Sequence, residues 1–268
     1  MADMMNSCEN CPVHNVSNLV KLGIDMEGFD YVITLAGNPN TGKSTVFNNL
    51  TGLRQHTGNW PGKTVTRAEG GFAYNNARYK AVDLPGTYSL LSTSTDEEVA
   101  RDFILFGQPD VTIIVVDATR LERNLNLVLQ VLEITDRAVV CLNLMDEAKR
   151  HNIEIDVREL SRELGVPVVP AAARQKEGMD ELLRYVEQVA TGKYICRPHR
   201  LKNKSKEVAG AIDELTKQIT EAFPQLPNPQ WVAMRLLEGD QSIIDALKSG
   251  ELGDLKRNLV TDIKKEAV

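Results

Sequence analysis

One short stretch of the chain combines the residue types and the spacing of a phosphate-binding loop. It covers residues 37–44, Gly-Asn-Pro-Asn-Thr-Gly-Lys-Ser, after the apolar run 31–36. Glycines let backbone N–H groups turn towards a phosphate, and the next helix adds the positive end of its dipole. Lys43 supplies a charge, and Ser44 can ligate Mg²⁺. Such a match arises by chance in roughly one random chain of this length in a hundred, so the loop alone is not decisive.

Two further polar boxes follow predicted strands. Asp83 and Gly86 come after the strand 79–82. The carboxylate can hold Mg²⁺ through water, and the Gly86 N–H can approach a γ-phosphate. Asn143 and Asp146 follow a later strand, and the Asp146 carboxylate can accept two hydrogen bonds from guanine, whereas adenine would leave it unpaired. An acidic turn and a helix N-cap are the ordinary alternatives, but the three boxes together favour a guanine nucleotide.

The elements that would position these boxes alternate between strand and helix. Strands are predicted at 31–36, 71–74, 79–82, 111–116, 138–142 and 166–169, and helices at 45–50, 98–106, 125–134, 157–164 and 179–191. This alternation predicts an α/β fold with a mostly parallel sheet, helices on both faces and ligands at the carboxyl ends of the strands. The hairpin 71–82 would add one antiparallel edge. Residues 52–66 and 86–96 are expected to be mobile loops beside the nucleotide.

The chain is expected to divide into three parts. Residues 1–30 form a loosely ordered extension, 31–197 the nucleotide-binding domain and 198–268 a small all-helical domain. In the last part, prolines and glycines separate predicted helices at 205–223, 229–237, 240–248 and 252–267.

The N-terminal extension carries Cys8, Cys11 and His14. Two thiolates and an imidazole at this spacing can converge on one tetrahedral zinc or iron ion. Two incidental thiols in a terminal extension are an equally good interpretation, and both stay open.

Composition narrows the functional classes. With 268 residues, of which 42% are hydrophobic and 25% charged, the chain can bury a sizeable core. Its formal net charge of −6 offers no basic field, so no nucleic-acid partner is expected. Four cysteines and the lack of a signal-like start indicate a cytoplasmic compartment. No run of about 18 apolar residues occurs, so a membrane role would need a further segment.

Taken together, the boxes resemble the small-GTPase superfamily and, within it, the cytoplasmic N-terminal region of the FeoB family of bacterial ferrous iron transporters. The similarity runs from about Tyr31 to the C-terminus and is carried by residues 37–44, 58–62, 83–90, 121–125, 143–146 and 231–240. It implies a P-loop, small-GTPase-like sheet followed by the helical domain that links the G domain to the membrane pore in that family. It also implies GTP and GDP as ligands, with Mg²⁺.

The resemblance implies a role for each matching residue. Lys43 would contact the β- and γ-phosphates, and Ser44 would ligate Mg²⁺. Thr64 would join Mg²⁺ only when GTP is bound. Asn40 matches a position that helps to coordinate an activating potassium ion. The expected catalytic residues are Lys43, Asn40, Thr64 and Gly86. The expected nucleotide-binding residues are Asn38, Asn40, Thr41, Gly42, Lys43, Ser44, Thr45, Asn143, Asp146, Ala172 and Ala173, and those for Mg²⁺ are Ser44, Thr64 and Asp83.

The sequence departs from the general pattern of this superfamily at several positions. Thr87 stands where a water-orienting Gln is usual, which predicts slow intrinsic hydrolysis. Leu144 replaces a lysine that packs against the base, which predicts fast nucleotide exchange. Lys63, next to Thr64, brings an ammonium that could compete with potassium. The last base-contacting box is degenerate, so backbone contacts near Ala173 are expected there.

The leading hypothesis is therefore a GTPase on the cytoplasmic face of the bacterial inner membrane, which regulates ferrous iron transport through its own transmembrane domain. A homo-oligomer is left open. A ribosome- or RNA-assembly GTPase is the alternative, although the acidic balance and the lack of a basic, aromatic-rich appendage disfavour it. A third hypothesis makes the N-terminal thiols a metal sensor or iron acceptor attached to the switch.

Overall fold

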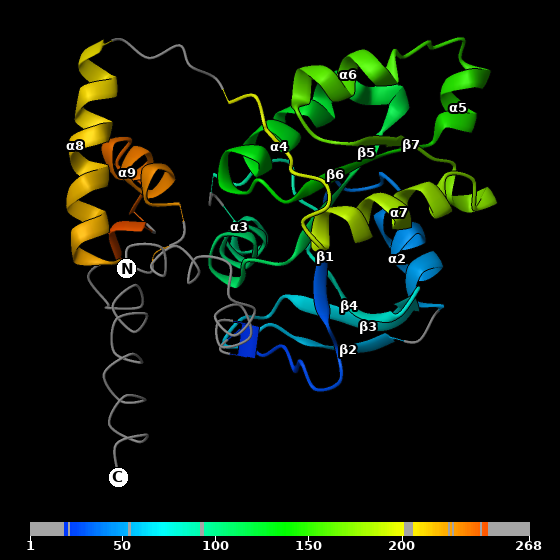
Figure 1. The fold of residues 1–268 in the computed structure, drawn as a ribbon, viewed down its shortest axis with the longest axis horizontal. Coiled ribbons are helices and arrows are strands. Elements are labelled where there is room, and N and C mark those ends of the chain that lie inside the picture. The colour runs from blue at the N-terminus through cyan, green and yellow to red at the C-terminus, as the bar shows by residue number, and fades with distance from the viewer. Residues whose placement is uncertain are drawn as a thin grey trace, which may run out of the picture. The chain divides into compact units, whose positions relative to one another are not determined.

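A computed structural model describes residues 19–20, 22–52, 55–91, 94–200, 206–224, 226, 228–241 and 243–245 (Figure 1). The chain separates into two compact units, residues 1–200 and 201–268. Each unit is described by itself. Within the described residues, none of the helices combines the length and the hydropathy that crossing a bilayer requires.

The first unit is an α/β domain. Its elements are β1 (Tyr31–Gly37), α2 (Lys43–Thr51), β2 (Gln55–Asn59), β3 (Thr66–Tyr74), β4 (Ala77–Asp83), α3 (Thr95–Gly107), β5 (Val111–Asp117), the 3₁₀ turn η1 (Ala118–Arg120), α4 (Leu121–Ile134), β6 (Ala138–Asn143), α5 (Met145–Arg150), α6 (Val157–Leu164), β7 (Val168–Pro170), the 3₁₀ turn η2 (Ala173–Gln175) and α7 (Met179–Ala190).

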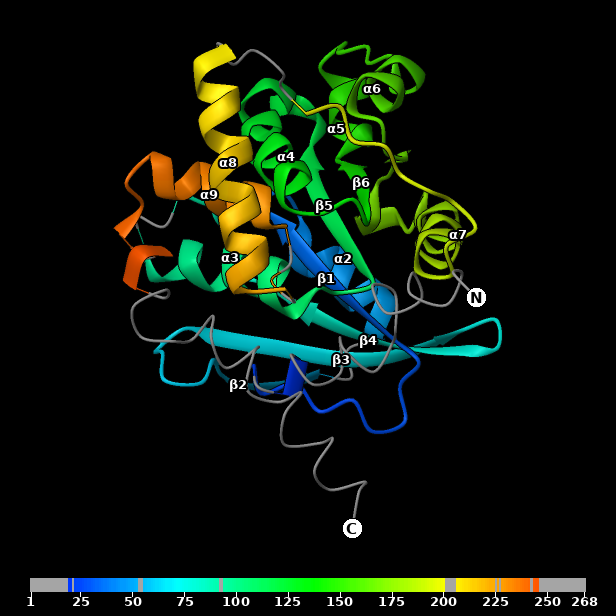
Figure 2. The same cartoon turned by 60° about the vertical axis from the view of Figure 1, so that its left-hand side comes forward.

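The strands form one sheet in the order β2-β3-β4-β1-β5-β6-β7. From β4 to β7 every neighbouring pair is parallel. Helices α3 and α4 cover one face, and α2 and α7 cover the other (Figures 1 and 2). The predicted fold class is confirmed. The interior strand β5 is buried from residue 111 to 116, as its continuous β-branched run indicates for a strand covered on both faces.

The antiparallel end of the sheet differs from the prediction. The predicted hairpin is β3 and β4, but β3 is not the edge, because β2 pairs antiparallel on its outer side. We expected a loop at residues 52–66. The described side chains of β2 are exposed, so backbone pairing alone holds this strand, and its sequence carries no apolar alternation that could have revealed it.

Residues 22–30, expected to belong to a loose extension, instead form an ordered strap (blue in Figure 1) along β3 and β4. Lys80 Nζ donates to Asp25 O at 2.8 Å, and Arg78 N donates to the Asp30 carboxylate at 2.7 Å. Ile24 is 1% exposed. Most of this segment is held by hydrogen bonds that involve backbone atoms. Such contacts produce no periodic pattern in the sequence, so the pattern did not predict them.

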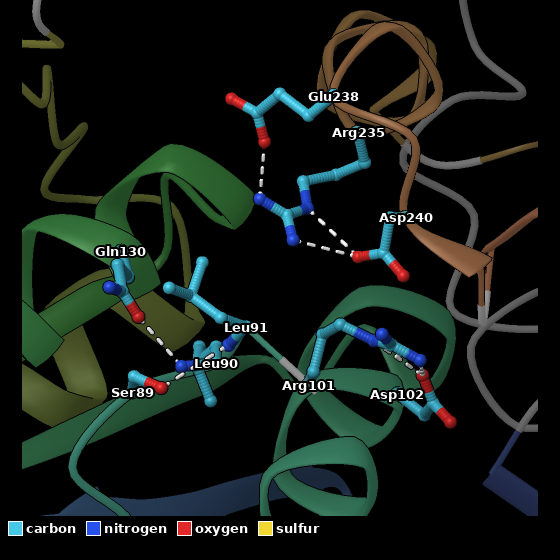
Figure 3. Close-up of polar contacts among 9 residues, drawn as sticks. All are labelled: Ser89, Leu90, Leu91, Arg101, Asp102, Gln130, Arg235, Glu238 and Asp240. Atoms are coloured by element: carbon cyan, nitrogen blue, oxygen red, sulfur yellow. Dashed lines mark hydrogen bonds and ion pairs between the residues drawn. The ribbon is translucent and has the colours of Figure 1, made fainter. Parts of the chain in front are cut away.

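The second unit contains α8 (Lys206–Ala222) and α9 (Pro229–Leu237), at the positions predicted. The Asn228 carboxamide caps α9 by accepting from Trp231 N at 3.1 Å. At the other end of α9, Arg235 Nη2 donates to Asp240 at 2.8 Å and Nη1 donates to Glu238 (Figure 3). Of the predicted helix 240–248, residues 241 and 243–245 are helical, whereas 242 and 246–248 lie outside the described residues, as does the whole predicted helix 252–267.

Asp110 offers a test of the core next to β1. Its carboxylate accepts from Val32 N at 2.8 Å and faces Arg137 Nη1 at 3.4 Å. Burial raises the pKa of Asp110, while the Val32 N–H and Arg137 act in the opposite direction. A folded pKa above the unfolded value of about 3.9 means that the folded state binds the proton more tightly than the unfolded state does. The resulting contribution to stability is present in acid and is lost as pH rises through the folded pKa.

We therefore expect the loss of stability in Asp110→Asn to be larger in acid than at neutral pH. Urea unfolding of both proteins over a pH series gives this difference directly. A cost that grows as pH rises would contradict the prediction, because the carboxylate would then be favoured in its ionised form.

Candidate nucleotide-binding site

The phosphate-binding loop joins β1 to α2, as predicted. Asn40 and Gly42 adopt the left-handed region with φ of 67° and 82°, and α2 begins at Lys43. Thr41 Oγ1 donates to Asn38 O at 3.0 Å and closes the turn. A Cβ on Gly42 would lie 2.3 Å from Asn143 Nδ2. Only glycine fits both the conformation and the space at position 42.

The Lys43 ammonium lies against the end of β4. Nζ donates to the Asp83 carboxylate and, at 2.6 Å, to Leu84 O. The side chains of Lys43 and Asp83 are largely buried, with 10% and 15% of their surface exposed. Burial raises the pKa of Asp83, and the Lys43 charge and hydrogen bond oppose that rise. The structure thus brings together the two residues that the sequence assigned to the phosphates and to Mg²⁺.

Gly86 and Thr87 also reach the loop. A Cβ on Gly86 would lie 3.3 Å from Pro39 Cα, and Thr87 N donates to Gly37 O at 3.2 Å. The Gly86 backbone therefore runs beside the loop, where the sequence placed it. The Thr87 side chain is buried.

Asn143 at the end of β6 ties three segments together. Its Nδ2 donates to Thr41 O at 2.9 Å, and its Oδ1 accepts from Ala173 N at 2.9 Å. The residue is 1% exposed. From α2, Asn49 Nδ2 donates to Ala173 O at 2.6 Å. Asn143 therefore connects the phosphate loop to the segment at Ala173 and acts as a brace between them. Its carboxamide is engaged within the protein and is not free on the surface to bind a base.

Asp146 lies in the first turn of α5 and is half-buried. Its Oδ2 accepts from Gln175 Nε2 and from Arg150 Nη2, both at 3.2 Å. The turn before it passes through Leu144, whose φ of 63° is uncommon for a bulky residue. Two planar donor groups thus already face the carboxylate that we assigned to guanine.

Sequence reasoning missed Gln175 and Asn49. Gln175 directly follows the degenerate last box, residues 171–174, and this position is a signal that could have found it. Asn49 is an ordinary helix residue six positions after Lys43, and nothing in the sequence marks it.

Other predicted site residues are not joined into this network. Asn40, Ser44, Thr45 and Thr64 are exposed, and in the described part of the chain no hydrogen bond joins Thr64 to Ser44 or Asp83. Ala172 is buried beside Ala173 and bonds backbone to backbone with Glu177 at 3.1 Å. Cys8, Cys11 and His14 lie outside the described residues.

Asn38 and Lys63 have surroundings that the sequence did not predict. Asn38 is 4% exposed, and its Nδ2 is buried without a hydrogen-bond partner in the part of the chain that the structure describes. Lys63 Nζ forms an ion pair with Glu98 at 2.9 Å, so its charge is engaged by α3.

The segment after Gly86, expected to be a mobile loop, is tied to two helices. Ser89 Oγ donates to Glu97 at 2.8 Å. Leu90 N donates to Gln130 Oε1 on α4 at 2.6 Å (Figure 3). Leu90 is buried, whereas Tyr88 and Leu91 are exposed. The described part of this segment is therefore anchored at Ser89 and Leu90, between the exposed Tyr88 and Leu91.

The donor set suits magnesium. A carboxylate at Asp83 and a hydroxyl at Ser44 are hard oxygen ligands of the type that Mg²⁺ prefers when it also binds phosphates. Asp83 reaches the site at the end of β4, and Ser44 is exposed in the first turn of α2.

Comparison with known proteins settles the family. Residues 31–186, more than half of the chain, match the family model described as ferrous iron transport protein B. The chain belongs to the FeoB family. Residues 205–267 match the model of the FeoB cytosolic helical domain, so both units carry a FeoB assignment.

Individual relatives agree with this assignment. The Fe(2+) transporter FeoB of Escherichia coli (strain K12) is 41% identical over 212 residues, which are 78% of this chain and 27% of that protein. The chain thus spans about a quarter of the length of the curated relatives that it matches.

Solved structures are similar over both units or over the first alone. The cytosolic domain of T. maritima FeoB in a GDP form has a TM-score of 0.73 at 34% identity and covers 84% of this chain and 85% of that one. The G domain of FeoB from Methanococcus jannaschii has a TM-score of 0.54 at 48% identity, and the match covers 60% of this chain and 97% of that one.

The brace at Asn143 yields a stability prediction. Asn143→Ala leaves Thr41 O and Ala173 N buried without a partner, which costs about 1–3 kcal/mol for each group. Urea unfolding should report a clear loss. The exposed Asn126→Ala on α4 is the matched control and should stay within about 0.5 kcal/mol of the parent chain. Equal stability of the two variants would show that Asn143 is no brace.

Proposed function

We propose that the chain is a magnesium-dependent GTPase domain that regulates ferrous iron transport. The observation that carries the proposal is the convergence of β1, β4, β6 and the loop after β7 on one site, held by Asn143 between Thr41 and Ala173. A nucleotide that lies across this edge meets Lys43 at its phosphates and Asp146 at its base. Ligands of open α/β sheets bind at this edge.

Charge at the phosphate end favours an exchange of partners. Without phosphate, the Lys43 ammonium is compensated by the Asp83 carboxylate. Phosphate oxygens would take over Lys43, and Asp83 would turn to the magnesium shell, with Ser44 as the direct ligand. When bound, Mg²⁺ would neutralise part of the charge on the phosphates. No charged group is left unpaired at either stage, which matters because a buried unpaired charge costs several kcal/mol.

At the base end, Asp146 provides the guanine preference. Gln175 and Arg150 hold its carboxylate, so the oxygens are oriented before a base arrives. Ala172 and Ala173 border the same region, and the backbone of Ala173 is held by Asn143 at its N–H and by Asn49 at its carbonyl. Leu144 offers no long aliphatic stem to the base, which supports quick nucleotide exchange.

Hydrolysis should be slow without a further activator. Thr87 is buried and cannot orient a water as a glutamine would. Stabilisation of the transferring phosphoryl group then depends on Lys43, the Gly86 N–H and bound cations. Asn40 is exposed in the loop, which is compatible with the proposed role of helping to hold a potassium ion, while Lys63 is engaged by Glu98.

The role in iron transport rests on the family. The matched curated relatives are named Fe(2+) transporters and are longer than this chain. We infer that the chain works at the cytoplasmic face of the inner membrane and that its partner is a transmembrane domain of the same protein. The RNA-assembly alternative is disfavoured by the net charge of −6. A metal site at Cys8, Cys11 and His14 stays a prediction.

The role of Asp146 in recognising guanine can be tested by changing its base preference. In a titration with a fluorescent GDP analogue and Mg²⁺, we expect saturable binding that GTP, but not ATP, displaces. Asp146→Asn loses two charge-assisted hydrogen bonds, so GTP affinity should fall roughly tenfold to a hundredfold and xanthosine nucleotides should bind better. Glu147→Gln on the same helix is the control and should change neither. Unchanged GTP affinity in Asp146→Asn would refute the base-reading role.

The cation assignment needs a separate measurement. Phosphate release should be faster in potassium than in sodium at equal ionic strength, because the proposed potassium ion beside Asn40 would help to stabilise the charge on the transferring phosphoryl group. In Asn40→Ala the rates in the two salts should become equal, while GDP affinity stays near that of the parent chain. A potassium effect that survives in Asn40→Ala would remove Asn40 from the mechanism.

A further inference from the structure

The turn that carries Thr64 is a compact unit. Trp60 N donates to Val65 O and Lys63 N donates to Trp60 O, each at 3.0 Å. Thr64 therefore lies within a closed backbone loop. Thr64 shares no hydrogen bond with Ser44 or Asp83 in the described part of the chain, and because the loop is closed by backbone hydrogen bonds, we expect residues 60–65 to move together when Thr64 joins a magnesium site. We call residues 60–65 the switch turn.

One side of the switch turn is held by α3. The Trp60 ring is 4% exposed and packs edge-on against Phe103, with ring centroids 5.3 Å apart. Lys63 pairs with Glu98, one helix turn beyond the start of α3. These contacts join the switch turn to the helix that follows the Gly86 segment.

The other side is held by the strap, residues 22–30. A Cβ on Gly23 would lie 3.0 Å from Pro61 Cγ and 2.8 Å from Arg67 Nη1, so the strap backbone touches both. Arg67 Nη1 donates to Leu22 O at 3.0 Å. The same guanidinium lies over the Trp60 ring, 5.3 Å from its centroid. The strap thus contacts the switch turn directly at Pro61 and, through Arg67, at Trp60.

The strap is also fixed to the sheet away from the switch turn. Phe29 lies so close to Gly71 that a Cβ there would be 2.7 Å from the ring. Arg78 and Lys80 both lie over the Phe29 ring, 5.3 Å and 5.2 Å from its centroid. One end of the strap is therefore clamped on β3 and β4 while the other end bears on the switch turn. The strap precedes the residues 31–186 that match the family.

We propose that the strap is an intramolecular regulator of the nucleotide switch, with Gly23 and Leu22 as positioning residues that hold Pro61 and Arg67 so that Thr64 points to solvent. This rests on the proposed GTPase function. The strap stabilises the conformation that GDP can use and that GTP with Mg²⁺ has to abandon. Weakening the contact therefore favours GTP over GDP, since a ligand shifts a conformational equilibrium only by its differential affinity for the two states.

Two glycines of the strap provide a matched pair of variants. Gly23 and Gly28 both have positive φ, 79° and 75°, so alanine strains the backbone alike at either position. The new methyl group meets Pro61 and Arg67 at position 23, but only Arg78 at position 28. Gly23→Ala should raise the ratio of GTP-analogue affinity to GDP affinity roughly fivefold, the factor that corresponds to about 1 kcal/mol. Gly28→Ala should leave the ratio within about twofold.

Pro61→Ala removes the same contact from the side of the switch turn without straining the strap, and it should shift the ratio in the same direction. Equal ratios in Gly23→Ala and Gly28→Ala, or a shift towards GDP, would overturn the proposal.

A measurement without nucleotide separates this proposal from the GTPase function. In a Trp231→Phe background Trp60 is the only tryptophan, so acrylamide quenching reports whether the switch turn is packed. We expect quenching of Trp60 to increase in Gly23→Ala and not in Gly28→Ala. If no variant binds nucleotide but quenching follows this pattern, the proposed function fails and the strap contact stands. If binding is normal and quenching is equal in both variants, the strap contact fails alone.

Discussion

The site depends on one buried side chain, the carboxamide of Asn143. A carboxamide offers a donor and an acceptor on one rigid plane, and here the donor reaches Thr41 O while the acceptor takes Ala173 N. These bonds fix the distance between the loop that would hold phosphates and the segment that would border the base. They also explain why position 42 is glycine, since Asn143 Nδ2 fills the space that a Cβ would need. The spacing of the site is therefore built from a polar contact inside the fold.

Charge compensation is the second constraint at this edge of the sheet. Lys43 and Asp83 come from different elements and are both largely buried, so each would be costly alone. Paired, they compensate each other's charge, and they are the two groups that Mg²⁺ and phosphate would engage. Asp83 has its pKa raised by burial and lowered by Lys43, which ties the ionisation of the carboxylate to the position of the lysine. Lys43 and Asp83 therefore contribute both to the stability of the protein and to its proposed affinity for a charged ligand.

The antiparallel end of the sheet links this site to the strap. Strand β3 pairs with β4 on one side and β2 on the other, and Thr64 lies in the turn between β2 and β3. The strap packs along β3 and β4. On its other side the switch turn contacts α3, through Phe103 and Glu98 of that helix. The switch turn thus lies between two elements of the same unit. Any movement of Thr64 towards magnesium has to change contacts with both.

The sequence by itself determined the parallel sheet and the loop between β1 and α2, because these follow from local patterns: apolar runs and a glycine spacing. The same patterns singled out Lys43, Asp83 and Asp146 as polar residues that follow strands, and their roles towards a nucleotide stay predictions. It also determined α8 and α9 through their proline and glycine boundaries. Only the tertiary structure decided that Asn143 braces two loops, that Asn49 and Gln175 belong to the site, that β2 forms the edge and that residues 22–30 bear on the switch turn. Each of these is a contact between segments far apart in the chain, made through backbone groups or single polar side chains. Such contacts leave no period in the sequence, so no local pattern could have announced them.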